Sequence, residues 1–570
     1  MRATARGMTL IDALIGVALI AVVFVGLAGV FRLSLVMVTL NKMRVGAVAL
    51  ASERMEVILG MEYNTIGTVG GIPPGPLEPT ETIERNGTTY TRRTLVVYTD
   101  DPADGLGGDD HNGITTDYKR VKVEVTWQYR DRTLSYAQVA SVIPPGIESS
   151  VGGGTLRIKI VDAAVAPLPG ITVRVENETT DPPIATEIFS NPDGEVILGG
   201  APAASNYHIV VSKDGYSSDG TLAPSADIPT PLQPLLTVEE GLTTAATFAV
   251  DRLANLAIHT WRAPTSTAFL DPISDTAHFA SWSNVQIADG ALSLVVGAAT
   301  GTATTTPLAP TPLESWLQFS WGASSSAPVR VQLWHEENGT LSLVPEEELP
   351  GNAAGFTASP IDLQSVATTT ASGLVARFDF VRNGEGVSPE LDWWRVAYRL
   401  GPAPLGGVTV RATSSKILGY DAANQPVPKH IIATTTNSEG ERLAGGIEWD
   451  AYAVGVDGWR VADVCPALPL LVAPGGTTKL DLFLEEDAGG SLRVVVVDEN
   501  GAAISGATAT LSRASWSAQR TTSTCGNAFF GDVSAGTYTL EVQKTGYTPS
   551  TSEVEVDGEE TASVTLLTGS

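Results

Sequence analysis

The chain is poor in charged residues, and basic residues are the scarcer kind. Only 17% of its 570 residues are charged, and 35 Lys and Arg stand against 63 Asp and Glu, which gives a formal net charge of −28. A surface this acidic repels nucleic acid phosphates, so we expect no nucleic acid binding by the main body. The composition favours a soluble, secreted protein.

Cysteine and histidine are also scarce. Cys465 and Cys525 are too few for a disulfide scaffold; they either pair in an oxidising compartment or stay buried thiols. The six histidines never fall at metal-ligand spacing, which leaves a zinc site without support. Nucleophile elbows, phosphate-binding loops and dinucleotide fingerprints are absent as well. We therefore expect no enzymatic activity and no certain cofactor.

Glycine and proline are plentiful instead. The chain holds 57 Gly and 35 Pro, a composition typical of many short strands joined by turns rather than of helical bundles. At roughly 100–200 residues per domain, the length predicts about three to five domains. We therefore expect a mostly β, multi-domain protein.

The longest apolar run lies near the N-terminus. No charged residue occurs from Ala13 to Phe31, and a helix of that length spans about 28 Å, close to the hydrocarbon core of a bilayer. Arg2 and Arg6 precede the run, which predicts a cytoplasmic N-terminus. We expect a single pass through the inner (cytoplasmic) membrane, with everything after Leu40 outside.

The apolar run continues into an amphipathic stretch rather than into a signal-peptide cleavage site. From Asn41 to Tyr63, apolar residues recur near the helical period. The pattern predicts one helix within residues 8–62, from Thr9 to near Glu62 and about 80 Å long. Its first half, up to residue 40, would cross the membrane, and its second half would pack on a sheet.

The residues before the apolar run resemble the prepilin motif of type IV pilins and type II secretion pseudopilins. A basic leader, residues 1–7, ends at Gly7, and Met8-Thr-Leu-Ile-Asp12 follows. The resemblance implies cleavage between Gly7 and Met8 by a prepilin peptidase, and N-methylation of Met8. It also implies that Asp12 neutralises the amine of an incoming subunit within lipid. The family usually has Phe in place of Met8 and Glu in place of Asp12.

A small antiparallel sheet is predicted after the helix, within residues 63–148. Its strand-like runs alternate apolar and polar residues. They are Thr88–Thr99, Tyr118–Tyr129 and Leu134–Ile143. With its apolar face on the helix, such a sheet would complete an α+β pilin module, as the resemblance implies.

The loop between the first two of these runs is rich in aspartate. Ca²⁺ prefers six to eight oxygen ligands on flexible, acidic backbone, and this loop can supply them. The spacing does not match an EF-hand, and a solvated hairpin loop accounts for the same residues. The candidate calcium ligands are Asp100, Asp101, Asp104, Asp109, Asp110 and Asp117.

After a glycine-rich linker at 149–154, one pattern recurs along the chain. Each copy has an opening strand, a turn that holds a glycine, and a closing segment with a tyrosine. The copies resemble carboxypeptidase-regulatory-like or collagen-adhesin B-type β-sandwiches, which implies stalks, spacers or binding modules. We place them at 155–258, 401–488 and 489–570.

Residues 259–400 differ from these repeats because they hold most of the tryptophans. Alternating runs separated by turns predict a jelly-roll-like β-domain that resembles the galactose-binding type in outline. Its tryptophans either fill the core or stack on sugars. Trp393 and Trp394 are the candidate glycan contacts.

The predicted fold is therefore an α+β pilin module followed by several all-β sandwich domains. We expect a minor pilin of a type IV pilus-like filament, displayed on an extracellular pilus or the cell surface for adhesion. Expected partners are a prepilin peptidase, other pilin subunits, the membrane, and a host or surface ligand such as a glycan. Two alternatives stay open: a pseudopilin of a type II secretion or DNA-uptake machine, and a membrane-anchored surface protein that does not polymerise.

Overall fold

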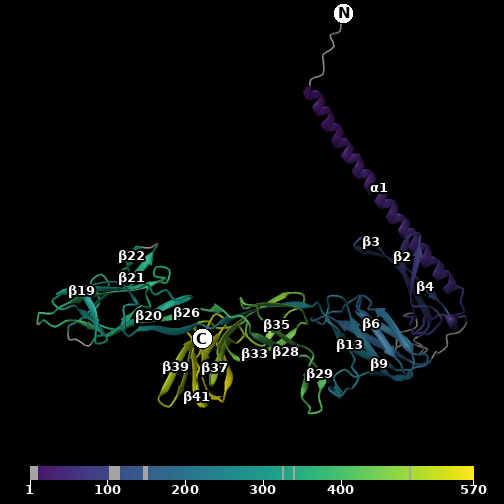
Figure 1. Cartoon of the computed structure of the whole chain (residues 1–570). Coiled ribbons are helices and arrows are strands. Elements are labelled where there is room, and N and C mark those ends of the chain that lie inside the picture. Colours follow the sequence, from purple (N-terminus) through teal and green to yellow (C-terminus); the bar gives the residue numbers. More distant parts are fainter. Residues whose placement is uncertain are drawn as a thin grey trace, which may run out of the picture. The chain divides into compact units, whose positions relative to one another are not determined.

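The computed structural model describes residues 10–101, 116–145, 152–323, 327–337, 340–384, 386–486 and 489–569. In this part of the chain, one long helix is followed by many short strands (Figure 1). The chain divides into two compact units, which we call unit 1 and unit 2. Unit 1 is Met1–Leu253 with Ile417–Lys429, and unit 2 is Ala254–Lys416 with His430–Ser570.

Unit 1 begins with α1 (Leu10–Leu59), a helix of 50 residues, and the short 3-10 turn η1 (Tyr63–Thr65). A four-stranded antiparallel meander follows in the order β1-β2-β3-β4, which we call the head sheet. Figure 1 shows it at the C-terminal end of α1. Its strands are β1 (Thr80–Arg85), β2 (Thr88–Thr99), β3 (Tyr118–Tyr129) and β4 (Arg132–Val142).

The head sheet contains the strands that the sequence predicts, and β1 in addition. Alternation in β3 buries Val121, Val123 and Val125 on the side of α1, as a half-buried strand requires. β1 has no clear strand signal in the sequence, because Thr80–Arg85 carries three acidic or basic residues among its six. It forms as the edge of the hairpin with β2.

The second half of α1 packs on one face of the head sheet. Its buried side chains are Ala47, Leu50, Ala51, Met55 and Ile58. Gly46 lies at a close approach, because a Cβ there would be 2.5 Å from the Tyr90 hydroxyl oxygen. That hydroxyl donates to the Met43 carbonyl at 2.9 Å.

A β-sandwich, which we call the first sandwich, follows the head sheet in unit 1. A hairpin of β29 (Ile417–Tyr420) and β30 (Pro426–Pro428) also belongs to unit 1, and its β29 pairs with β11. The two main sheets of the first sandwich run β13-β5-β8 and β10-β9-β6-β7. The strands are β5 (Gly154–Val161), β6 (Thr172–Asn177), β7 (Ile184–Phe189), β8 (Glu195–Ala201), β9 (Ala204–Ser212), β10 (Asp219–Gly220), β11 (Thr230–Pro231), β12 (Leu236–Val238) and β13 (Thr243–Ala249).

Unit 2 contains a sandwich whose opening strand is separated from the rest, and we call it the split sandwich. Its sheets run β27-β14-β36-β34 and β31-β28-β33-β35, and β32 also pairs with β14. The strands are β14 (Ala254–Arg262), β27 (Ala403–Pro404), β28 (Thr409–Ser414), β31 (Ile431–Thr435), β32 (Glu441–Ile447), β33 (Asp450–Val456), β34 (Trp459–Cys465), β35 (Leu470–Val472) and β36 (Thr477–Glu486).

The last sandwich ends unit 2. Its sheets run β40-β37-β43 and β39-β38-β41-β42. The strands are β37 (Ser491–Asp498), β38 (Thr508–Arg513), β39 (Trp516–Thr521), β40 (Asn527–Phe530), β41 (Gly536–Gln543), β42 (Ser550–Val556) and β43 (Glu559–Leu566).

All three sandwiches share one topology. The opening strand of each pairs antiparallel with a middle strand and parallel with the last strand: β5 with β8 and β13, β14 with β32 and β36, and β37 with β40 and β43. A buried tyrosine marks each copy and donates its hydroxyl to a backbone carbonyl a few residues upstream. These bonds run from Tyr207 to Pro202, from Tyr452 to Glu448 and from Tyr538 to Ser534.

The split sandwich corrects two of the domain boundaries expected from the sequence. The boundary between 155–258 and 259–400 falls inside β14, which belongs to the split sandwich through its parallel pairing with β36. The opening strand of the repeat expected at 401–488 is therefore β14, and an inserted domain interrupts the sandwich after it. Local sequence cannot reveal this, because His259 and its partner Asp481 are 222 residues apart.

The inserted domain occupies β15 to β26. Its sheets run β15-β26-β20-β23, β16-β19-β24-β21-β22 and β17-β18-β25 around an aromatic core. The strands are β15 (Thr265–Asp271), β16 (Phe279–Ser283), β17 (Val285–Ala288), β18 (Ala291–Leu294), β19 (Thr300–Thr305), β20 (Leu313–Gly322), β21 (Arg330–Glu337), β22 (Thr340–Leu343), β23 (Ile361–Asp362), β24 (Leu374–Val381), β25 (Glu390–Leu391) and β26 (Trp393–Leu400).

Candidate functional site: the N-terminal helix and the domain junctions

The first half of α1 exposes an apolar surface. Most of its large apolar side chains, from Leu10 to Val38, are more than half exposed, and the helix is long and apolar enough to cross a membrane. Exposure of this much contiguous apolar surface is unfavourable in water. The described part of the chain does not bury these side chains, so the first half of α1 should be stable only in an apolar environment.

The residues of the prepilin-like motif lie at the start of this helix. Gly7 and Met8 fall outside the described residues. Asp12 is helical and comes two residues after Leu10, and its side chain is likewise outside the description. Cleavage, methylation and the role of Asp12 in assembly thus stay predictions.

Polar contacts fix the second half of α1 to the head sheet. Arg92, on the α1 side of β2, donates to the Leu50 carbonyl at 3.3 Å and pairs with Glu81 at 3.0 Å. Arg54 of α1 reaches the same Glu81 carboxylate at 3.4 Å and donates to the Thr94 hydroxyl at 3.3 Å. A shared carboxylate between two partly buried guanidinium groups ties helix, β1 and β2 together.

A buried lysine holds the chain where α1 ends. Lys119 of β3 donates from Nζ to the carbonyls of Tyr63 and Ile66, at 2.8 and 2.7 Å. Its ammonium also lies 4.7 Å from the centre of the Tyr63 ring. Burial lowers the pKa of the Lys119 ammonium to about 8. This role could not be predicted from the sequence, since Lys119 lies in the alternating pattern of an ordinary strand.

The aspartate-rich loop is described only at its two ends. Asp104, Asp109 and Asp110 lie outside the described residues, whereas Asp100, Asp101 and Asp117 lie within them. The Asp101 backbone N–H donates to the Asp117 carboxylate. Among the described residues, no group of three or more His, Cys, Asp or Glu is placed to hold a metal ion. A calcium site at this loop stays a prediction.

The head sheet joins the first sandwich through apolar packing within unit 1. Ile72, in the glycine- and proline-rich loop after α1, is buried in the core of the first sandwich. Leu95 and Val97, on the face of β2 opposite Arg92, pack against the same core. The Ala185 N–H donates to the Gly70 carbonyl at 2.9 Å and fixes the loop.

The split and last sandwiches join through a disulfide within unit 2. Cys465 at the end of β34 and Cys525 before β40 are bonded, with their Cα atoms 5.5 Å apart, in the usual range for a disulfide. The sequence left pairing and free thiols open as alternatives. Two adjacent domains are thus covalently linked.

Polar side chains surround this disulfide. Asn527 is buried and donates from Nδ2 to the Val464 carbonyl at 3.0 Å and to the Cys525 carbonyl at 3.1 Å. Burial raises the pKa of the neighbouring Asp463, against hydrogen bonds from Ser523 and the Val464 N–H. The junction is therefore polar and hydrogen-bonded.

The two tryptophans proposed as glycan contacts lie in different environments. Trp394 is 2% exposed, and its indole N–H donates to the Asp271 carboxylate at 2.9 Å inside the core of the inserted domain. Because it is buried, its ring has no face free to stack on a sugar. Trp393 is 36% exposed and stays available at the surface.

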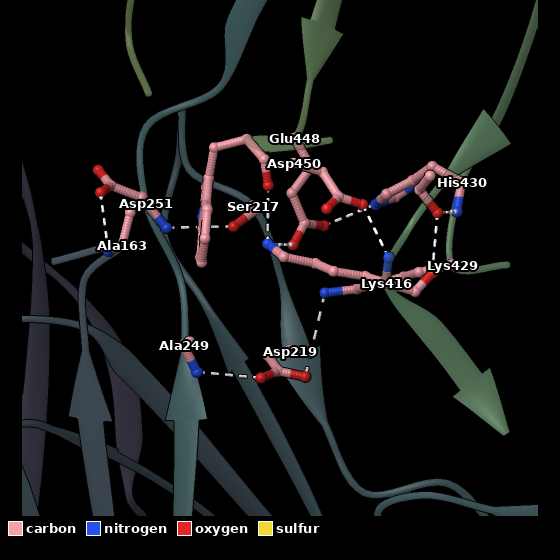
Figure 2. Close-up of polar contacts among 12 residues, drawn as sticks. Ala163, Ser217, Asp219, Ala249, Asp251, Lys416, Lys429, His430, Glu448 and Asp450 are labelled. Carbon is pink, nitrogen blue, oxygen red and sulfur yellow. Dashed lines mark hydrogen bonds and ion pairs between the residues drawn. The ribbon is translucent and has the colours of Figure 1, made fainter. Parts of the chain in front are cut away.

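Figure 2 shows a polar cluster in the split sandwich that the sequence analysis missed. The buried Glu448 carboxylate lies 2.8 Å from Lys416 Nζ and 2.6 Å from His430 Nε2. The Lys416 ammonium also lies over the Trp449 ring, 3.1 Å from its centre. A buried carboxylate needs such partners to be tolerated. We interpret the cluster as structural.

The same view shows Asp219 of the first sandwich. Its carboxylate accepts the Ala249 N–H at 3.0 Å and lies 4.0 Å from Lys429 Nζ. Lys429 ends the segment of unit 1 that carries the β29–β30 hairpin, and its Nζ donates to the Ser218 carbonyl at 2.8 Å. These contacts anchor the hairpin to the first sandwich.

Comparison with protein families identifies the last sandwich. Residues 491–567 match the family described as the carboxypeptidase regulatory-like domain. This confirms the resemblance seen in the sequence for the C-terminal repeat. The first and split sandwiches share its strand pairings. A comparison with curated proteins found no match.

Comparison with solved structures finds matches of low similarity. The TIE protein of Bacillus anthracis is 11% identical, covers 86% of this chain and 73% of its own, and has a TM-score of 0.16. BcpA, the major pilin subunit of Bacillus cereus, is 9% identical over 73% of this chain and 100% of its own, with a TM-score of 0.15. The RrgB pilus protein of Streptococcus pneumoniae is 10% identical over 73% and 98%, with a TM-score of 0.13. Scores this low establish no shared architecture.

Proposed function

We propose that this chain is a type IV pilin-like subunit that displays β-domains outside the cell. The exposed apolar half of α1, joined to a head sheet by its other half, carries the proposal. An uncharged run from Ala13 to Phe31 suits both a bilayer and the interior of a helical filament. The prepilin-like residues Gly7, Met8 and Asp12 add a reason for assembly that a plain membrane anchor lacks.

We further propose that the subunit is a minor one and has no enzymatic activity. The residues after the head sheet form sandwiches and an inserted domain, which would crowd a filament if every subunit carried them. Their disulfide-linked, repeated architecture suits a stalk that presents a binding surface. Exposed Trp393 on the inserted domain is the candidate contact for a glycan.

The first experiment determines the mature N-terminus. The full chain is co-expressed with a prepilin peptidase and analysed by intact-mass and peptide mass spectrometry. We expect a chain that begins at N-methylated Met8, and loss of that species in Gly7→Leu. An uncleaved Met1, or cleavage beyond Phe31, would contradict a pilin and leave a membrane anchor or a secreted protein.

A second experiment separates a subunit that polymerises from a surface protein that does not. Sheared filaments from cells that produce the chain are probed for it, with Asp12→Ala as the comparison. A pilin or pseudopilin should depend on Asp12 for incorporation while staying cleaved at Gly7. A chain that reaches the surface equally well with Asp12→Ala, and is absent from filaments, would be a non-polymerising surface protein.

A further inference from the structure

A groove with both basic and apolar lining lies where α1 leaves its apolar half and meets the head sheet. It has a volume of about 350 Å³ and is lined from one side by Asn41 and Lys42 of α1. Arg85 and Asn86, at the β1–β2 turn, line it from the other side. Val45, Gly46 and Ala49 of α1 complete the lining.

The groove is basic in an acidic protein. The chain as a whole has 63 acidic and 35 basic residues, yet no acidic residue occurs between Asp12 and Glu53. Lys42 is exposed and makes no ion pair with any described residue. Two cations and two side-chain amides thus face one groove, a donor set that suits an anionic oxygen group.

The groove lies on the outer side of the apolar run. Lys42 comes eleven residues, or about 16 Å of helix, after Phe31, where the uncharged run ends. The headgroups add about 5–8 Å on each side of the hydrocarbon core, and long basic side chains reach back toward that interface. With α1 across the membrane as proposed above, Lys42 and Arg85 therefore face the outer headgroup layer.

One acidic side chain competes for the groove. Arg85 Nη1 lies 3.5 Å from the Glu53 carboxylate, and both side chains are largely exposed. An exposed ion pair of this kind contributes at most about 1 kcal/mol. A doubly hydrogen-bonded phosphate at the membrane surface can therefore replace Glu53 as the partner of Arg85.

We propose that this groove binds the phosphate of an anionic phospholipid in the outer leaflet of the membrane that α1 crosses. The proposal rests on the proposed membrane insertion of α1. Lys42 and Arg85 supply the charge, and the amides of Asn41 and Asn86 supply further donors. A lipid bound there fixes the depth and the rotation of α1, and with it the direction in which the head sheet faces.

The test uses the full chain in detergent micelles, titrated with phosphatidylglycerol or phosphatidylcholine and read by native mass spectrometry. The groove variant is Lys42→Gln with Arg85→Gln. The matched control, Arg120→Gln with Arg132→Gln, removes two exposed charges from the strands of the head sheet. Because each basic residue near an anionic surface strengthens binding about fivefold, the groove variant should retain phosphatidylglycerol roughly 10- to 30-fold more weakly, and the control should match the wild type.

Several results would overturn the proposal. The first is an equal loss of phosphatidylglycerol binding in the groove variant and in the control. The second is equal retention of phosphatidylglycerol and phosphatidylcholine by the wild type. The third is displacement of the bound lipid by millimolar inorganic phosphate. A dimer that disappears in the groove variant would assign the groove to a second copy of the chain instead. Flotation of the full chain with liposomes, followed by alkaline extraction, tests insertion separately. A chain released by extraction would contradict the anchor, whatever the micelle titration shows.

Discussion

The molecule joins neighbouring domains in two different ways. In unit 1 the head sheet meets the first sandwich through Ile72 and the apolar face of β2. In unit 2 the split sandwich meets the last sandwich through the Cys465–Cys525 disulfide and buried polar groups. Apolar packing weakens smoothly as atoms are removed, whereas a covalent link is either present or absent. The unit 2 junction should therefore depend on an oxidising compartment, and the unit 1 junction should not.

Removing the disulfide should give the largest effect. Cys465→Ser with Cys525→Ser opens a link between residues 60 apart, and the entropy of the closed loop predicts a loss of about 4 kcal/mol. In calorimetry of the full chain, the transition of the last sandwich should fall while that of unit 1 stays unchanged. Reduction of the wild type should reproduce the result. An unchanged transition would mean that the polar contacts alone hold the junction.

Truncating Ile72 should give the next largest effect, confined to unit 1. Ile72→Ala removes buried atoms from the core of the first sandwich and should destabilise unit 1 by about 3 kcal/mol. Hydrogen exchange at the amides of Leu95 and Val97 reports the loss. Val69→Ala, in the same loop but half exposed, should change stability by less than about 0.5 kcal/mol. Similar effects of the two substitutions would show that packing of Ile72 in the core of the first sandwich does not stabilise unit 1.

Truncating Asn527 should produce a smaller change, in unit 2. Asn527→Ala leaves the carbonyls of Val464 and Cys525 without their donor, which should cost about 1–2 kcal/mol. Faster hydrogen exchange in β34 is the expected readout. Asn500→Ala, at an exposed turn of the same sandwich, is the matched control. If both variants exchange alike, the disulfide is sufficient to hold the junction.

The structural features of this chain differ in whether a short stretch of sequence is enough to predict them. The long helix, the three longer strands of the head sheet and the recurring tyrosines follow from periodicity and repetition within short stretches. The split sandwich does not, because β14 and β36 pair across an entire inserted domain. Ile72 was also missed, since a single apolar residue among glycines and prolines has no periodicity that would mark it as core.

The candidate sites also differ in how far they can be predicted from short stretches of sequence. The prepilin-like residues are contiguous and could be recognised in the sequence, although Gly7 and Met8 lie outside the described structure. The groove under the head sheet could not, because Lys42 and Arg85 come together only when the β1–β2 turn folds back on α1. Trp394 was misassigned as a surface contact, since its alternation with Trp393 does not reveal which ring faces the core.

The smallest expected effect is a pH dependence of stability, which should have opposite signs in unit 1 and unit 2. Lys119 has a pKa of about 8 in the folded head and an ordinary value of 10.5. Between these values the unfolded chain keeps the proton and the folded chain loses it, so the stability of unit 1 should rise with pH. From pH 7 to pH 9 the gain is about 1 kcal/mol. A neutral amine still has two hydrogens for the Tyr63 and Ile66 carbonyls, so deprotonation need not break these bonds.

Asp463 of unit 2 acts in the opposite direction, because burial raises its pKa in the folded chain. Its contribution to stability is present below the pKa of the unfolded carboxyl and is lost as pH rises through the folded value. Calorimetry across pH 4 to 9 should move the two units in opposite directions, with Lys119→Met and Asp463→Asn each abolishing one trend. Parallel shifts that persist in both variants would assign the pH dependence to other groups.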